Sequence, residues 1–278
     1  MNDNLAALAP ENLVISCGMY ASTQTLVEAW EELFTSFFEA LGLVDLPFAI
    51  QNETALALFH QPNFFLGHTC GYPFVRTLSE THETLCVPIF DVPGCDGIQY
   101  LSWFITHADN QGESLEDFRG QVVCINSHTS NSGMNVLRAA ISPIARNRRF
   151  FRKTLISGGH LKSIKLVASK KADLASIDAV TFDQLKRSGQ FDPDSIRIIG
   201  QSEPCTGLPF VIPRKPHAGR FIDKDVMLDT LNQALEGLIP IQEDALRIRR
   251  FERVFDSDYD SIQKMIDRAG MYGYQIIE

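Results

Sequence analysis

Short apolar runs, each followed by a polar turn and then by a helical pattern, are the feature that most constrains how this chain can fold. The clearest runs are residues 122–125, 153–156 and 173–177. Repeated alternation of strand and helix predicts an α/β fold. Ligands of open α/β sheets bind beyond the carboxyl ends of the strands, so the three turns mark an expected binding edge.

The same alternation extends along the rest of the chain. Further strands are predicted at residues 13–17, 48–50, 64–67, 85–90, 100–106, 197–199 and 208–212. Helices are predicted at residues 25–41, 132–141 and 161–169, with a capped start at 114–117 and a mostly helical pattern from Asp223 onward. In the first helix, apolar residues recur every three or four positions and Gly42 follows, so its aromatic side chains are expected in the core.

Length and charge narrow the class of partner. With 278 residues the chain can form two compact lobes or one large domain. Its formal net charge of -9 disfavours nucleic acid and anionic membrane surfaces. The one basic run comprises Arg146, Arg148, Arg149, Arg152 and Lys153, interrupted by two phenylalanines. We interpret this run as a solvated helix exit.

The spacing of the cysteines bears on metal binding, and the N-terminal sequence bears on cellular location. The six cysteines contain no C-x-x-C pair, so zinc binding is not expected. Residues 1–11 lack the basic and apolar regions of a secretion signal, and no apolar run has membrane-spanning length. Either a leader has been removed from this chain or the protein works in the cytoplasm.

The turn from Asn126 to Gly133 combines hydroxyl and amide side chains between a strand and a helix. Such a helix start offers unpaired backbone N–H groups and the positive end of the helix dipole, which favour a negatively charged ligand. An ordinary helix cap is the alternative, but a cap needs one such side chain and this turn has six hydroxyl or amide side chains.

Two further residues follow strands at the same expected edge. His160 comes after Ser157-Gly158-Gly159, and Asp178 follows an apolar strand, where it is either a ligand contact or the cap of a helix beginning near Ala179. Ser127, His160 and Asp178 could also form a hydrolytic triad. The chain contains neither a G-x-S-x-G elbow nor a glycine-rich phosphate loop.

Five segments carry a resemblance to a known family. In chain order they read TCGYP from residue 69, NSHTSNSGMNVLR from 126, SGGH from 157, ADLASIDAVT from 172 and GLPFV from 207, with Ser163 accompanying the third. Together they resemble the PhnD-like substrate-binding proteins of phosphate and phosphonate ABC importers.

The resemblance implies a two-lobed α/β structure, the type II periplasmic-binding-protein fold. Each lobe would be a mixed sheet flanked by helices, with the ligand cleft between the lobes. Lobe one would comprise residues 1–103 and 205–278, and lobe two residues 104–204. Strand crossings between the lobes would lie near residues 102–106 and 203–208.

The resemblance also implies a set of ligand-binding residues. Helix-start contacts would come from Ser127, Thr129, Ser130, Asn131 and Ser132, with His160 adding a further contact. Tyr20 and Tyr72 would cover the ligand from lobe one. Phosphonate binders often have an acidic residue after the histidine, whereas this chain has Leu161, leaving Asp178 as the carboxylate. The implied ligand is therefore a small oxyanion: phosphate, phosphonate or similar.

We therefore expect the substrate-binding component of an ABC importer, acting by lobe closure and not as an enzyme. No cofactor or metal is expected, the partner would be an ABC permease, and the location would be periplasmic. One alternative is an enzyme on this fold, either the hydrolase above or a pyrimidine-forming type, whose cysteine-rich metal motif is absent. The other is a cytoplasmic ligand sensor, supported by the missing signal.

Overall fold

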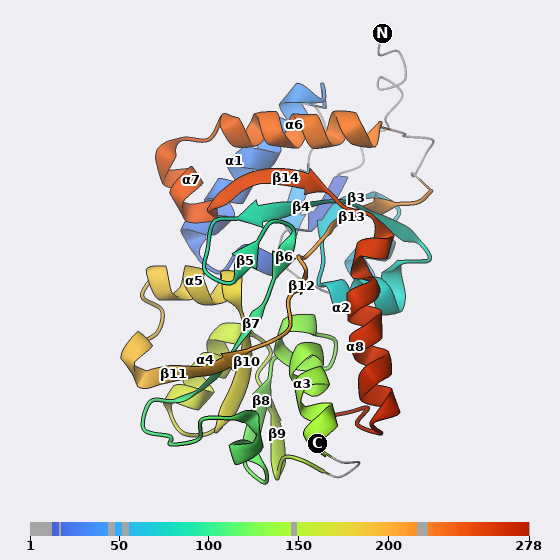
Figure 1. Ribbon diagram of the computed structural model, residues 1–278. Helices are drawn as coiled ribbons and strands as arrows, with labels where there is room; N and C mark the ends of the chain where they lie inside the picture. The colour runs from blue at the N-terminus through green and yellow to red at the C-terminus, as the bar shows by residue number, and fades with distance from the viewer. Residues whose placement is uncertain are drawn as a thin grey trace. The chain divides into compact units, whose positions relative to one another are not determined.

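A computed structural model describes residues 13–16, 18–43, 48–51, 56–145, 149–215 and 222–277 (Figure 1). The chain divides into two compact units. Unit 1 comprises residues 1–91 and 207–258, and unit 2 comprises residues 92–206 and 259–278. The chain thus changes unit after Asp91, after Thr206 and after Asp258, whereas the sequence predicted crossings near 102–106 and 203–208 only.

Unit 1 is built on a mixed six-stranded sheet in the order β14-β4-β13-β3-β1-β2. Its strands are β1 (Leu13–Ser16), β2 (Phe48–Gln51), β3 (Phe64–His68), β4 (His82–Phe90), β13 (Phe210–Pro213) and β14 (Ile248–Arg253). β1 pairs in parallel with β2 and β3, while β13 and β14 pair antiparallel with β4. The edge strand β14 lies in the segment from Asp223 onward, which is mostly helical as predicted but includes this strand.

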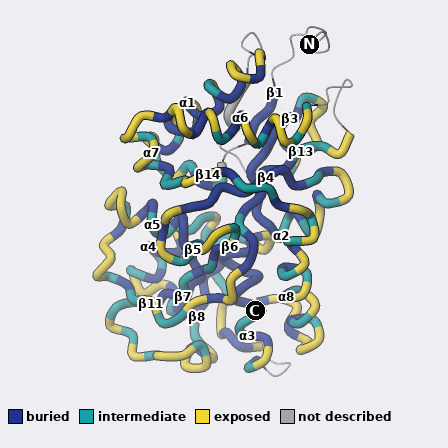
Figure 2. Tube along the Cα trace, turned by 45° about the horizontal axis from the view of Figure 1, so that its top comes forward, coloured by how far each residue is buried: buried dark blue, intermediate teal, exposed yellow. Residues whose placement is uncertain are grey.

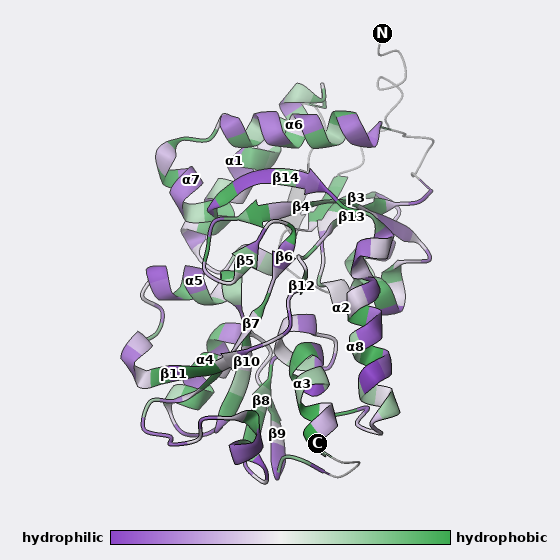
Figure 3. Ribbon diagram, in the orientation of Figure 1, coloured by the Kyte–Doolittle hydropathy of each residue, from purple (hydrophilic) through white to green (hydrophobic). Residues whose placement is uncertain are grey.

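The helices of unit 1 are α1 (Gln24–Ala40), α6 (Lys224–Glu236) and α7 (Pro240–Leu246), with a short α2 (Gly71–Pro73). Thr23 caps α1 by accepting a hydrogen bond from the N–H of Leu26. The aromatic face of α1 is buried, with Trp30 stacked on Phe34 at a centroid distance of 5.8 Å. These aromatics are core residues, as predicted, and α6 shows the same alternation of hydrophobic and hydrophilic residues (Figure 3).

Unit 2 contains a five-stranded sheet in the order β11-β7-β10-β8-β9. Its strands are β7 (Ser102–His107), β8 (Val122–Ile125), β9 (Lys153–Ile156), β10 (Leu174–Asp178) and β11 (Ile196–Gln201). β9, β8 and β10 run parallel, and β7 is antiparallel to β10 and β11. A small sheet, β12-β6-β5, joins Cys205–Thr206, Gln99–Tyr100 and Cys95–Asp96.

The helices of unit 2 include α3 (Val136–Ala145), α4 (His160–Ala168), α5 (Ala179–Arg187) and α8 (Asp260–Met271). α4 and α5 contact β10 of the larger sheet, whereas α8 contacts α3. The core joins inward residues of the strands, such as Cys124 and Ile177, to Ile164 and Val167 of α4. The inner strands β7, β8 and β10 are largely buried, whereas the edge strands β9 and β11 are partly exposed (Figure 2).

The last helix belongs to unit 2, although the sequence placed residues 205–278 in lobe one. The buried face of α8, formed by Ile262, Met265 and Ala269, packs in the same unit as α3, which α8 contacts. A helix with one apolar face lies where that face is removed from water. The sequence shows that such a face exists, but it does not show which sheet or helix will cover it.

Several of the predicted features lie in or beside segments that the structure does not describe. Residues 1–11, Cys17, Arg146 and Arg148 lie outside the described residues. Within the basic run, Arg149, Arg152 and Lys153 are exposed, which agrees with a solvated helix exit, while Phe150 and Phe151 are buried. No helix in the described part of the chain is long and apolar enough to cross a membrane.

Candidate anion-binding site

Three turns follow neighbouring parallel strands of unit 2 at one edge of the sheet. Ser127 lies after β8, His160 after β9, and Asp178 ends β10. β8 lies between the other two strands, with Ile125 aligned with Ile156 and Cys124 with Ala175. The predicted common edge is therefore confirmed for the three turns.

The first turn holds itself together through its own side chains. The N–H of Ser127 donates to Oδ1 of Asn126 at 3.0 Å, and the N–H of Thr129 donates to Oγ of Ser127 at 3.2 Å. The hydroxyls of Ser127 and Thr129 are 3.1 Å apart. One hydrogen bond joins two hydroxyls that each carry a donor hydrogen, so one hydrogen of the pair is left for a ligand.

The following helix begins with a wide, π-helical turn over Asn131–Asn135. Its N–H groups bond five residues back, from Asn135 to the carbonyl of Ser130 at 3.0 Å and from Val136 to that of Asn131. The hydroxyl of Ser130 caps the turn by accepting from the N–H of Gly133 at 3.0 Å. Such wide turns occur often at functional sites.

This turn leaves a backbone donor without an acceptor at its start. Among the residues that the structure describes, no acceptor is found for the N–H group of Ser132. The hydroxyl of Ser130 accepts from Gly133, so its own hydrogen is available to donate. These donors lie at the positive end of the helix dipole, where an anion is stabilised.

His160 belongs to the same cluster. Its Nε2 lies 3.0 Å from Oγ of Ser132, and its Nδ1 is buried with no partner in the described chain. Burial lowers the pKa of His160 from 6.5 to about 4, so the ring is neutral at pH 7. The neutral ring and the hydroxyl each carry one donor hydrogen, and one bond between them leaves one hydrogen uncommitted in either tautomer.

Gly133 is required where it stands. A Cβ built at this position would lie 2.0 Å from Oδ1 of Asn126, closer than atoms can approach. The side chain of Asn126, which begins the turn, therefore occupies the space that a larger residue at 133 would need. This contact explains why the polar segment ends on a glycine.

Asp178 caps a helix, which was one of its two predicted roles. It is 2% exposed, and its Oδ1 accepts from the N–H of Thr181 at 2.9 Å at the start of α5. Because Nε2 of His160 bonds to Ser132 and its Nδ1 has no partner, Asp178 does not orient the imidazole. The described contacts of Ser127, His160 and Asp178 thus do not form a hydrolytic triad.

Asn131 is fully buried and is engaged within unit 2. Its Nδ2 donates to the hydroxyl of Tyr100 at 3.0 Å and to Sγ of Cys205 at 3.2 Å. Asn135 and Arg138, which lie near this side chain on the same helical face, were not among the predicted functional residues. The sequence does place polar residues at positions 131, 135 and 138. This i, i+4, i+7 spacing puts them on one face of a helix.

The two tyrosines predicted to cover the ligand belong to unit 1. Tyr20 is 2% exposed and makes edge contacts with His68 and Phe90, at centroid distances of 5.2 and 5.0 Å. Tyr72 is partly exposed in the helical turn that follows β3.

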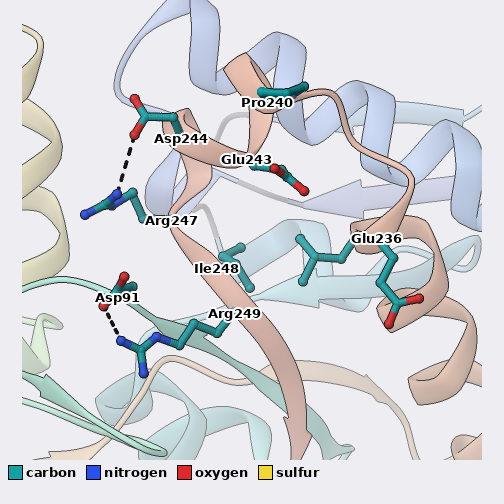
Figure 4. Close-up of a pocket in the computed structure, with 9 residues that line it drawn as sticks. Asp91, Glu236, Pro240, Glu243, Asp244, Arg247, Ile248 and Arg249 are labelled. Atoms are coloured by element: carbon teal, nitrogen blue, oxygen red, sulfur yellow. Dashed lines mark hydrogen bonds and ion pairs between the residues drawn. The ribbon is translucent and has the colours of Figure 1, made fainter.

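A pocket of about 410 Å³ lies elsewhere in unit 1, beside α6, α7 and β14 (Figure 4). It is lined by the carboxylates of Asp91, Glu236, Glu243 and Asp244. Its two arginines pair with carboxylates, Arg247 with Asp244 and Arg249 with Asp91. This acidic lining repels anions, so the pocket does not compete with the turn of unit 2 as an anion site.

Mixed sheets flanked by helices, with polar strand-to-helix turns at one sheet edge, are consistent with the periplasmic-binding-protein class. Residues 19–259 match the family described as "ABC transporter, phosphonate, periplasmic substrate-binding protein". The chain belongs to this family. None of the curated proteins matches it.

Solved structures of the same fold cover nearly the whole chain. A binding protein component of an ABC phosphonate transporter from Pseudomonas aeruginosa is 16% identical, with a TM-score of 0.74 and coverage of 95% of this chain and 88% of its own. PhnD1 from Prochlorococcus marinus, in complex with methylphosphonate, is 13% identical, with a TM-score of 0.74 and coverage of 94% and 99%.

A third structure widens the range of ligands found on this fold. The alkanesulfonate-binding protein SsuA from Xanthomonas axonopodis pv. citri, bound to MOPS, is 13% identical, with a TM-score of 0.61 and coverage of 98% and 97%. At these identities the likeness establishes the fold, which is the type II periplasmic-binding-protein fold predicted from the sequence.

Proposed function

We propose that this protein binds a small oxyanion, such as phosphate or a phosphonate, as the substrate-binding component of an ABC importer. Family membership supports the class of protein. The observation that carries the ligand class is the wide helical turn after β8, where the N–H group of Ser132 has no acceptor in the described chain.

The proposed contacts are neutral donors. They are the hydroxyl hydrogen that the Ser127–Thr129 bond leaves free, the hydroxyl of Ser130, the hydrogen that the Ser132–His160 bond leaves free, and the N–H group of Ser132. Hydrogen bonds to an ionised acceptor are roughly twice as strong as neutral ones, so several such donors hold an oxyanion without a full counter-charge.

The remaining predicted site residues take other parts in this proposal. Asn131, whose side chain is fully buried, would hold the shape of the turn, and Asp178 would cap α5. Tyr20 and Tyr72 of unit 1 would cover the ligand when the two units close, as in hinge closure around ligands generally. Small-angle scattering with and without ligand tests the closure, because an unchanged radius of gyration contradicts it.

The binding test is calorimetric titration with methylphosphonate, phosphate, phosphite and an alkanesulfonate. The double variant Ser127→Ala/Ser130→Ala should bind the best of these anions at least about tenfold more weakly, because it loses two donors. Ser142→Ala is the matched control, since its hydroxyl is buried in α3 and bonds the carbonyl of Ala139. If no anion binds, or if the double variant binds like the control, the proposal fails.

Delivery to a permease and a periplasmic location are also proposals. Both rest on family membership. Fractionation of cells from the natural source, with an antibody against this protein, tests the location. Recovery with the cytoplasmic fraction would contradict it and would favour a ligand sensor.

A further inference from the structure

A buried arginine lies one helical turn beyond the candidate anion site. Arg138 of α3 is 5% exposed. Its Nη2 donates to Oδ1 of Asn135 at 2.6 Å, and its Nη1 donates to the backbone carbonyl of Gln275 at 2.7 Å. Burying a cation is costly unless its donors are satisfied, so a buried arginine here calls for a reason.

The contacts continue from Arg138 back to the site. Nδ2 of Asn135 donates to Oδ1 of Asn131 at 2.9 Å. Asn131 and Asn135 are the first and last residues of the wide turn, so this bond joins its two ends. Nδ2 of Asn131 in turn reaches Tyr100 of β6 and Cys205 of β12, which ties the turn to the small sheet.

The arginine fixes the direction of this chain of hydrogen bonds. A guanidinium has only donors, so the atom of Asn135 that faces it must be the oxygen. The amide nitrogen of Asn135 then faces Asn131, whose oxygen must accept it. The nitrogen of Asn131 is thereby directed toward Tyr100 and Cys205. Each amide has one orientation only, and Arg138 sets it.

We propose that Arg138 is a positioning residue that holds the Asn131–Asn135 turn in its wide form through Asn135 and Asn131. A wide turn is rare and less favourable than an α-helical one, so it needs contacts from outside its own backbone. The Asn131–Asn135 bond, oriented by Arg138, supplies them. The step from this positioning to affinity rests on the proposed anion binding.

The test compares Arg138→Gln and Arg138→Lys with Ser142→Ala. In the protein without ligand, hydrogen exchange at the N–H groups of Asn135 and Val136 should become at least about tenfold faster in both Arg138 variants, and exchange in the rest of α3 should change less. Methylphosphonate affinity should fall about tenfold, a change of about 1.4 kcal/mol. Lysine keeps the positive charge but lacks the planar guanidinium that donates to both Asn135 and Gln275. The Arg138→Lys variant therefore distinguishes a positioning role from simple electrostatic attraction of the anion.

Asn135→Asp gives a second variant that retains a partner for Arg138. A carboxylate only accepts, so it loses the donor to Asn131 and should loosen the turn in the same way. The positioning role is overturned if exchange at Asn135 and Val136 stays as in wild type, if Arg138→Lys behaves as wild type, or if the whole of unit 2 loosens equally. Local loosening in a protein that binds none of the anions would support the positioning role and refute the proposed function instead.

Discussion

Oγ of Ser132 lies 3.0 Å from Nε2 of His160, which joins the turn after β8 to the turn after β9. The carbonyl of Ser132 also accepts a hydrogen bond from the hydroxyl of Ser176 on β10, at 2.5 Å. Ser132 therefore connects three neighbouring strands at the edge where the ligand is proposed to bind. The bond to the histidine also decides how many donors the pair can offer.

We expect Ser132→Ala and His160→Ala to be strongly non-additive in anion affinity. Either change removes the bond between the two side chains, and the remaining partner can then turn away from the ligand. The double variant should therefore lose less than the sum of the single losses, with a coupling free energy of about 1 kcal/mol or more. Calorimetry on the four proteins of the cycle measures it, and additive losses would show that the two groups act separately.

Replacing Gly133 should destabilise the protein. Gly133→Ala places a Cβ 2.0 Å from Oδ1 of Asn126 and should cost about 1 to 3 kcal/mol in free energy of unfolding. Removing the obstacle in Asn126→Ala/Gly133→Ala should recover part of that cost. Urea denaturation measures both values.

Gly200→Ala is the control for this pair of variants. A Cβ at that position meets only a side-chain atom of Phe104, at the ordinary contact distance of 3.8 Å. It should therefore change stability much less than Gly133→Ala. Equal losses at the two positions would mean that the contact with Asn126 is not the cause.

The strands and helices around the site were predictable because their signals are local. Val122–Ile125 and Lys153–Ile156 are bounded by turn residues, and the structure has the same bounds. The wide form of the turn was not predictable, since it depends on Asn135 and Arg138 meeting partners such as Gln275, far away in the sequence. Periodicity reports which face of a helix is apolar and says nothing of such partners.

The roles of single polar residues could be predicted only in part from the sequence. Asp178 was predicted either as a cap or as a ligand contact, and the bond to the N–H of Thr181 supports the cap. The resemblance to the PhnD-like family implied that Asn131 contacts the ligand. The complete burial of this asparagine depends on Tyr100 and Cys205, which come from other strands, so no local pattern could have revealed it.

Stability should fall in mild acid because of His68 in unit 1. Burial lowers its pKa from 6.5 to about 3, although the hydrogen bond of its Nε2 to the carbonyl of Leu208 acts in the opposite direction. Between these values the unfolded chain binds more protons than the folded one, so the free energy of unfolding decreases as pH falls from 6.5 toward 3. His160, with its pKa near 4, acts in the same direction.

His68→Gln tests this effect, because glutamine can still donate to Leu208 but does not titrate. The variant is expected to be less stable at pH 7, since it loses the stacking of His68 on Phe210 at 4.3 Å. Its loss of stability between pH 6.5 and 4.5 should nevertheless be smaller than that of wild type by about 2 kcal/mol. Urea denaturation at the two pH values measures the difference, and equal losses would show that His68 does not titrate in this way.

The end of α8 offers a matched pair of glycine substitutions with opposite signs. Gly270 lies inside the helix, and a Cβ there would meet nothing within 4 Å, so Gly270→Ala should stabilise the protein by about 0.5 to 1 kcal/mol. Gly273 lies just beyond the helix with a φ of 67°, in the left-handed region. The N–H of Gly273 bonds the carbonyl of Gly270, and the N–H of Tyr274 bonds that of Ala269, the paired contacts of a helix-ending glycine. Gly273→Ala should therefore destabilise by about 1 kcal/mol. Thermal unfolding of the two variants beside wild type measures both shifts, and shifts of the same sign would contradict this account of how α8 ends.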